Sequence, residues 1–303
     1  MRQQHLRGRG PHIPPLDSVV QFEFEPGYVL FPIAVQKRLR VEAGGAVIAD
    51  TVRGVLLYES DHLPVYYFPI EDIRTDLMVE SGQLAGDPFK GTATYYSLQT
   101  PAGRIENLMW RYDGAVAGCP DLSGYASFDW PKADRWLEED EEIFVHPRDP
   151  FRRVDILPSS RHVQIYLGGG MVAETRRAHL LFETGLPTRY YLPIEDVLSG
   201  ILQPSATVSR CPYKGLANYY NVELKGRLYP DLVWHYPEPL HEAGRVRGLI
   251  SFASELVDKV VVDGQEQPRP VTALSVSAGI DGTDRQPEST STVMPTAELV
   301  ADV

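Results

Sequence analysis

The strongest constraint on the fold is an internal repeat with a constant offset of 124 residues. The segment Tyr66–Asp72 (YYFPIED) recurs without a gap as Tyr190–Asp196 (YYLPIED). The same offset relates identical residues throughout both segments, among them Gly44/Gly168, Arg53/Arg177, Glu59/Glu183, Lys90/Lys214, Tyr95/Tyr219, Trp110/Trp234 and Ser127/Ser251. A register this long indicates a tandem duplication. We predict two related domains, at residues 31–137 and 155–265.

Each copy is predicted to be mainly β. In the second copy, His162–Leu167 alternates between apolar and polar residues, and Gly168–Gly170 then turns the chain into a return strand. Further short strands are expected at 180–182, 189–192, 217–224, 228–235, 248–252 and 259–262. Each copy therefore has the pattern of a small antiparallel β-sandwich or rolled sheet.

Helices are expected to be few and short. Pro193 followed by two acids is typical of a helix start, but Gly200 and Pro204 interrupt the helix soon after it begins. A second helical turn is expected at 239–243, which gives one or two short helices per copy. Neither copy has the strand, long helix and strand alternation of a Rossmann or P-loop unit.

The distinctive charge lies mostly outside the repeats. The 303 residues include 29 Lys and Arg against 41 Asp and Glu, for a net charge of -12. A basic N-terminal arm and lead-in (1–30) precede the first copy, an acidic linker (138–154) joins the copies, and an acidic tail (266–303) comes after the second. We expect disorder up to about Ser18 and from about residue 270, because these segments have too little apolar surface to offset their chain entropy.

Composition excludes several classes of protein. No window approaches the roughly 18 apolar residues of a membrane span, and the N-terminal residues lack the apolar run of a secretory signal, so we expect a cytoplasmic protein with no membrane partner. A pI of about 5.1 argues against nucleic acid as a partner. The two cysteines, Cys119 and Cys211, cannot form a four-cysteine zinc site, and a disulfide between them is not expected in that compartment. No paired-histidine, Walker or Gly-x-Gly-x-x-Gly pattern on a helix predicts a metal or a cofactor.

Several short motifs of the second copy carry a family resemblance. They are Arg189-Tyr190-Tyr191-x-Pro193, Cys211-Pro212-x-Lys214-Gly215, Trp234-x-Tyr236 and Gly248-x-x-x-Phe252. With these motifs the chain resembles domain-of-unknown-function family 427 over essentially the whole of each copy. The resemblance implies a compact, mostly β fold of the tent-like kind, often present in tandem, and no established reaction. The nucleotidyltransferase-like label sometimes given to the family finds no support, since neither copy has a Gly-Ser turn followed by closely spaced acids for two metals.

Cys211, Lys214 and His235 are the candidate catalytic residues. Arg210 and Lys214 flank Cys211, and nearby cations favour the nucleophilic thiolate form of cysteine. The first copy has Asp87 in place of Cys211, and a carboxylate cannot replace a thiol nucleophile. A packed turn cysteine is therefore the alternative interpretation.

Cationic and aromatic residues are the candidates for ligand binding. The Lys-Gly turn present in both copies is suited to hold a phosphate or a carboxylate, and aromatic strands suit a planar or anionic ligand. The candidates are Arg189, Tyr191, Lys214, Tyr219, Trp234 and Tyr236 in the second copy, and Lys90, Tyr95 and Trp110 in the first. Packing between sheets explains the same aromatics without a ligand.

The adjacent carboxylates of both copies are predicted to have a structural role. Neighbours such as Glu195 and Asp196 on a helical turn point about 100° apart, so they do not converge on one metal. Charge complementarity at a helix start is the favoured role, and an ion pair of Asp72 or Asp196 with Arg53 or Arg177 is the alternative.

The sequence supports three functional hypotheses. Binding or sensing of an anionic or planar aromatic small molecule is favoured, because the Lys-Gly turn is duplicated. An enzyme with one thiol-based or Lys/His-assisted site in the second copy, and a structural or protein-interaction module, are the alternatives. We expect a monomer whose copies pack as a pseudo-two-fold pair.

Overall fold

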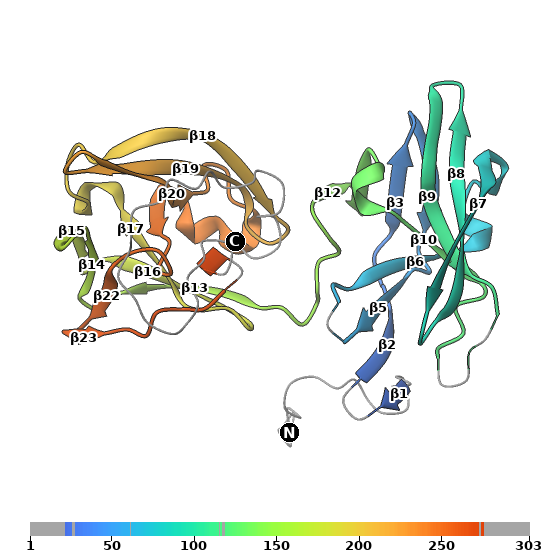
Figure 1. Cartoon of the computed structure of the whole chain (residues 1–303), viewed down its shortest axis with the longest axis horizontal. Helices are drawn as coiled ribbons and strands as arrows, with labels where there is room; N and C mark the ends of the chain where they lie inside the picture. The colour runs from blue at the N-terminus through green and yellow to red at the C-terminus, as the bar shows by residue number, and fades with distance from the viewer. Residues whose placement is uncertain are drawn as a thin grey trace, which may run out of the picture. The chain divides into compact units, whose positions relative to one another are not determined.

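The computed structural model describes residues 22–25, 28–60, 62–114, 116, 119–272 and 274–275. The chain divides into two compact domains, Met1–Asp149 and Pro150–Val303. Within the described residues every strand pairing is antiparallel and the helices are short 3₁₀ turns, which confirms the mainly β prediction (Figure 1). No described helix has the length and apolarity needed to span a membrane. The predicted disordered arm lies outside the described residues, as does the tail from 276.

The first domain pairs a large sheet with a small one. The large sheet has the order β1 (Phe22–Glu25), β2 (Tyr28–Ala34), β5 (Val55–Glu59), β6 (Val65–Pro69), β10 (Tyr125–Phe128), β9 (Gly103–Tyr112), β8 (Gly91–Thr100) and β7 (Met78–Asp87). The small sheet has the order β12 (Glu141–Ile143), β11 (Arg135–Glu138), β3 (Leu39–Ala43) and β4 (Ala46–Thr51). The 3₁₀ turns are η1 (Ile70–Asp72), η2 (Thr75–Leu77) and η3 (Trp130–Lys132).

The second domain repeats this architecture. Its large sheet has the order β13 (Val154–Ser159), β16 (Ala178–Glu183), β17 (Arg189–Pro193), β21 (Leu249–Phe252), β20 (Arg227–His235), β19 (Gly215–Leu224) and β18 (Leu202–Cys211). Its small sheet has the order β15 (Gly170–Thr175), β14 (Val163–Leu167), β22 (Lys259–Val262) and β23 (Gln265–Glu266). The 3₁₀ turns are η4 (Ile194–Asp196) and η5 (His241–Val246).

The predicted glycine hairpin is present in both small sheets. β14 alternates between buried and half-buried residues, as its sequence predicts, and pairs with β15 across the turn at Gly168 and Gly169. These two glycines have φ angles of 59° and 75°, in the left-handed region where a Cβ is unfavourable. Gly44 and Gly45 take the same conformation between β3 and β4, with φ angles of 57° and 75°.

The large sheet is packed on both faces. In β6, Tyr66 and Phe68 belong to the core between the sheets, whereas Tyr67 belongs to a second cluster on the opposite face. The two adjacent tyrosines therefore place one ring on each face of the sheet. The chain between β20 and β21 covers this opposite face in the second domain, where Ala243 and Val246 of η5 are fully buried.

No strand is predicted for residues 197–210, where all but the last residue of the long edge strand β18 lies. Its residues alternate in exposure along one side of β19, and the register is interrupted between Pro204 and Val208. β7 has a matching interruption between Glu80 and Leu84. Proline is tolerated at such an edge, where its missing N–H leaves no neighbouring strand unpaired.

The helix expected from Pro193 is only the three-residue turn η4. Asp196 accepts two hydrogen bonds from Arg177, at 3.0 and 2.7 Å, and Arg53 pairs with Asp72 at 2.8 Å in the first domain. These contacts favour the ion-pair alternative, although the arginine side chains are more than half exposed. A turn this short has little dipole for the acids to complement.

Both predicted flanking segments begin with ordered contacts. In the segment assigned to the acidic linker, Glu138 is buried and accepts a 2.7 Å hydrogen bond from Tyr66, and residues 141–143 form β12. In the segment assigned to the tail, Arg269 donates hydrogen bonds of 2.9 Å to the carbonyls of Glu255 and Asp258.

Candidate functional site

An aromatic row crosses the covered face of each large sheet. In the second domain Trp234 pairs with Ser251 on one side and Tyr219 on the other, and Ser251 also pairs with Tyr191. Directly paired residues of antiparallel strands share a face, so the structure brings the predicted Tyr191, Tyr219 and Trp234 together. The first domain repeats the row, with Trp110 paired to Ser127 and Tyr95.

The row is held by buried hydrogen bonds. The Trp234 indole Nε1–H donates to the Tyr191 hydroxyl at 3.0 Å, and both side chains are almost completely buried. The Tyr219 hydroxyl lies 2.7 Å from that of Ser209. Burial raises the pKa of Tyr191 and of Tyr219 above the ordinary value, so both phenols stay neutral. The row supplies neutral hydroxyl groups and ring surfaces rather than an acid or a base.

A buried lysine lies at one end of each row. Lys214 forms an ion pair with Glu183, a carboxylate that Arg152 also contacts at 3.2 Å. Lys90 of the first domain forms the equivalent ion pair with Glu59. Both lysines are at most 6% exposed, so neither predicted lysine is a solvated turn residue.

Arg189 is neutralised by a partner that only the second domain has. Its Nη1 and Nη2 donate to the two carboxylate oxygens of Glu255 at 2.6 and 2.7 Å, and its guanidinium lies 5.4 Å from the centre of the Trp234 ring. Burial acts to raise the pKa of Glu255, but the hydrogen bonds and charge of Arg189 outweigh it and hold the pKa below its ordinary value. The equivalent positions of the first domain are Val65 and Pro131.

The three candidate catalytic residues are not gathered. Cys211 is buried near the lysine turn, whereas His235 comes directly after Trp234 in β20 and so points to the opposite face of the sheet. His235 stacks on Tyr220 with ring centroids 5.1 Å apart, and burial lowers its pKa. No group of three or more potential metal ligands is found in the described parts of the chain.

The predicted ligand residues surround only a very small cavity. Its volume is about 10 Å³, and Glu183, Leu186, Pro187, Arg189, Tyr191, Lys214 and Trp234 line it. This is room for a single water-sized species. Tyr236 is fully buried, and Tyr219 does not line the cavity. In the first domain, Tyr95 lies 6.2 Å from Trp110 between ring centroids.

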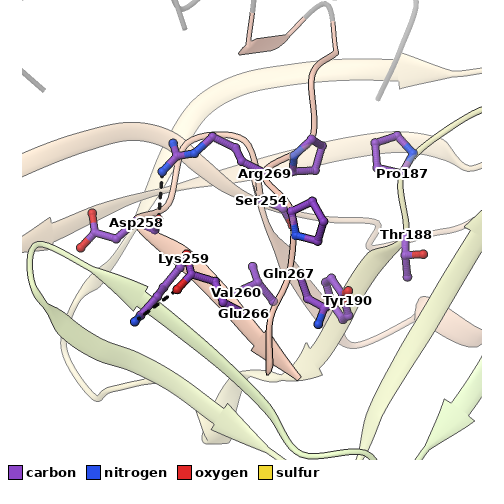
Figure 2. Close-up of a pocket in the computed structure, with 12 residues that line it drawn as sticks. Pro187, Thr188, Tyr190, Ser254, Asp258, Lys259, Val260, Glu266, Gln267 and Arg269 are labelled. Carbon is purple, nitrogen blue, oxygen red and sulfur yellow. Dashed lines mark hydrogen bonds and ion pairs between the residues drawn. The ribbon is translucent and has the colours of Figure 1, made fainter. Parts of the chain in front are cut away.

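A much larger pocket opens on the other face of β17. It has a volume of about 390 Å³, within the range of small-molecule sites (Figure 2). Its lining comes from β17 and the chain entering it, from β22 and the turn before it, and from the end of β23 and the segment after it. The lining residues are Pro187, Thr188, Tyr190, Ser254, Asp258, Lys259, Val260, Glu266, Gln267, Pro268, Arg269 and Pro270. Pro187 borders both cavities.

The pocket combines apolar walls with a cation that has no acidic partner in the described structure. Asp258 accepts the backbone N–H of Gly169 at 2.8 Å, and Lys259 lies 3.5 Å from Glu266. Arg269 makes its two hydrogen bonds to backbone carbonyls and has no carboxylate partner among the described residues. The lining thus holds two acids, Asp258 and Glu266, and two bases, Lys259 and Arg269, and Arg269 is the base without a carboxylate partner in the described structure.

Tryptophans of the first domain stand at the positions of the pocket residues. Trp130 and Trp136 are equivalent to Ser254 and Val260 at the repeat offset. Their rings stack with centroids 4.2 Å apart and an interplanar angle of 3°, and Trp136 belongs to the domain core. The second domain is therefore hollow at the positions where the first domain is packed with two indoles.

Several residues of these two sites are not among the predicted site residues. Glu183 and Ser251 belong to the repeat, and their recurrence at the offset is the sequence signal that marks them. The hydroxyls of Ser127 and Ser251 are buried without a hydrogen-bond partner in the described structure. The pocket has a fainter signal, the replacement of Trp130 and Trp136 by small residues.

Comparison with known proteins agrees with the duplicated architecture. A family model described as "Domain of unknown function (DUF427)" matches residues 33–139 and again residues 155–263. A search of curated proteins gives no match.

Proposed function

Since the chain belongs to the DUF427 family through two tandem domains, we propose that it is a small-molecule binding protein with its ligand site in the second domain. The observation that carries this proposal is the 390 Å³ pocket at the positions where the first domain holds two stacked tryptophans. Both domains keep the same strands around this position, so the difference lies in the side chains.

The ligand we propose is a planar aromatic acid. A space that two stacked indoles occupy in one domain is flat and apolar, and aromatic rings prefer such stacked arrangements. In the second domain Val260 and Tyr190 supply apolar walls to the pocket. The Tyr190 hydroxyl has no hydrogen-bond partner in the described structure, whereas the equivalent Tyr66 hydroxyl donates to Glu138. The ring then lies on Val260 and Tyr190, and the acid faces Arg269.

The test uses indole-3-acetate, indole and tryptamine as acidic, neutral and basic probes with the same ring. We expect indole-3-acetate to bind the full chain most tightly in calorimetric titration. Val260→Trp installs the residue of the first domain in the pocket and should weaken binding at least tenfold. Val208→Trp is the matched control, because Val208 is 61% exposed on β18 and does not line the pocket.

Arg269→Gln separates the charge from the shape of the site. It should weaken the binding of indole-3-acetate and leave the binding of indole unchanged, because Arg269 is expected to contact only the acidic group. Failure of all three probes to bind, or equal binding to the wild type and Val260→Trp, would overturn the proposal and favour a structural role for the domain.

A further inference from the structure

The two buried lysines, Lys90 and Lys214, differ in their number of carboxylate partners. Lys90 pairs with two carboxylates, Glu59 and Asp87, and the second contact measures 2.8 Å. Lys214 has Glu183 as its one carboxylate partner within the described residues, and Cys211 stands at the position of Asp87. The second domain has lost one negative charge beside a buried ammonium group.

Asp87 also satisfies backbone groups of its turn. Its Oδ1 accepts the N–H groups of Phe89 and Lys90 at 2.9 and 2.8 Å. Cys211 has no carboxylate oxygen to accept them, and the backbone N–H of Lys214 has no hydrogen-bond partner in the described part of the chain. The ammonium group and the backbone N–H of Lys214 are thus retained in the second domain without that carboxylate.

A cavity of suitable size borders this lysine. The space of about 10 Å³ is lined by the cations Lys214 and Arg189, by the Glu183 carboxylate that pairs with Lys214, and by Tyr191. The Tyr191 hydroxyl accepts from Trp234 and donates to no described group. Leu186 and Pro187 cover it. It admits one species about the size of a water molecule and excludes polyatomic anions such as phosphate.

We propose that this cavity of the second domain binds a single halide ion of the chloride class. The halide replaces the charge of the missing carboxylate and accepts hydrogen bonds from Lys214 and Tyr191. Lys214 has one carboxylate partner where Lys90 has two, and a charge-assisted hydrogen bond to the halide supplies the second anionic acceptor. The inference concerns the face of β17 opposite to the aromatic-acid pocket and does not depend on the proposed function.

The experiment titrates the full chain with sodium chloride against sodium gluconate at constant ionic strength, with the indole N–H NMR signals as the readout. Trp234 lines the cavity, whereas Trp110, Trp130 and Trp136 lie in the first domain and serve as internal controls. We expect a saturable shift of the Trp234 signal with chloride only. Saturating chloride should also raise the melting temperature of the second domain by about 2–4 °C.

Cys211→Asp is the decisive variant, because it supplies the carboxylate of the first domain. It should abolish the response of Trp234 to chloride. If this variant does not fold, bromide-soaked crystals of the wild type decide the question by an anomalous peak beside Lys214. An unchanged Trp234 signal, or bromide found at exposed sites alone, would show that the cavity holds water and would overturn the proposal.

Discussion

Trp130 and Trp136 stack almost in parallel, at 4.2 Å and 3°, and the Trp136 indole donates to the Trp130 carbonyl at 3.3 Å. This pair closes a space that is open in the second domain. Because both domains come from one chain with one register, the pair shows how a few side chains turn a packed site into a pocket.

Trp136→Val should open the corresponding space in the first domain. Loss of a buried tryptophan removes apolar contacts and leaves a cavity, so we expect the unfolding free energy of that domain to fall by about 3–5 kcal/mol. Urea denaturation followed by the Trp110 indole N–H NMR signal measures it, with Val47→Ala at an exposed position as the control. A loss below about 1 kcal/mol would mean that Trp136 is not a packing residue.

Removing one partner of the Arg189–Glu255 ion pair should destabilise the second domain more than replacing both partners with apolar residues. Arg189→Met alone leaves a buried carboxylate unpaired and should destabilise the second domain by about 3–5 kcal/mol. The double variant Arg189→Met with Glu255→Leu should recover much of this loss, because the first domain folds with Val65 and Pro131 at these positions. A double-mutant cycle in urea tests this, and additive losses would contradict it.

The same ion pair predicts the direction of an acid transition. The folded-state pKa of Glu255 lies below the unfolded value. Its stabilising contribution is therefore complete above about pH 4.3 and is lost as the pH falls through the folded pKa. Glu255→Gln should flatten the dependence of stability on pH in this acid range, as measured by urea unfolding at several pH values. An unchanged slope would show that Glu255 does not titrate differently on folding.

The buried tyrosines predict that the second domain also loses stability at high pH. Burial raises the pKa of Tyr191 and of Tyr236 above their ordinary value. The folded state therefore keeps protons that the unfolded state releases, so stability is retained below about pH 10 and falls at higher pH. Ultraviolet absorbance during alkaline titration should show these phenols ionising only together with unfolding. Reversible ionisation in the folded state would contradict the burial.

The two thiols should both react slowly near neutral pH. Burial raises the pKa of half-buried Cys119 to about 11, with the nearby Lys90 opposing the effect, so its thiolate is scarce at pH 8. Cys211 is buried and should react only when the domain opens. Iodoacetamide labelling followed by peptide mass spectrometry measures both rates. Rapid labelling of Cys211 at pH 7 would instead support the enzyme hypothesis.

Local sequence patterns predict a large part of the fold. The duplication, the mainly β class and the hairpin at Gly168 and Gly169 are confirmed, because each depends on identities or alternation over adjacent residues. β18 is not predicted, since an exposed edge strand containing Pro204 lacks the apolar alternation of a buried one. The monomeric state, the cytoplasmic location and the site assignments stay predictions.

The site is less accessible to sequence reasoning, because its contacts join distant residues. Arg189 and Glu255 are 66 positions apart, and no motif links them. The pocket exists because its lining side chains are small. Small side chains form no sequence motif, so only their arrangement in the folded domain shows the pocket. Comparing the two copies position by position is the available route, because Trp136 and Val260 stand at equivalent places.

The register interruptions of β7 and β18 affect how these edge strands can pair with a strand of another molecule. Both strands end a large sheet, and each breaks its register at the same point of the repeat, between Glu80 and Leu84 or between Pro204 and Val208. A straight strand from another molecule cannot align its hydrogen bonds along such an irregular border. Val208 and Leu84 therefore lie exposed on edge strands that are poor templates for pairing with a second molecule.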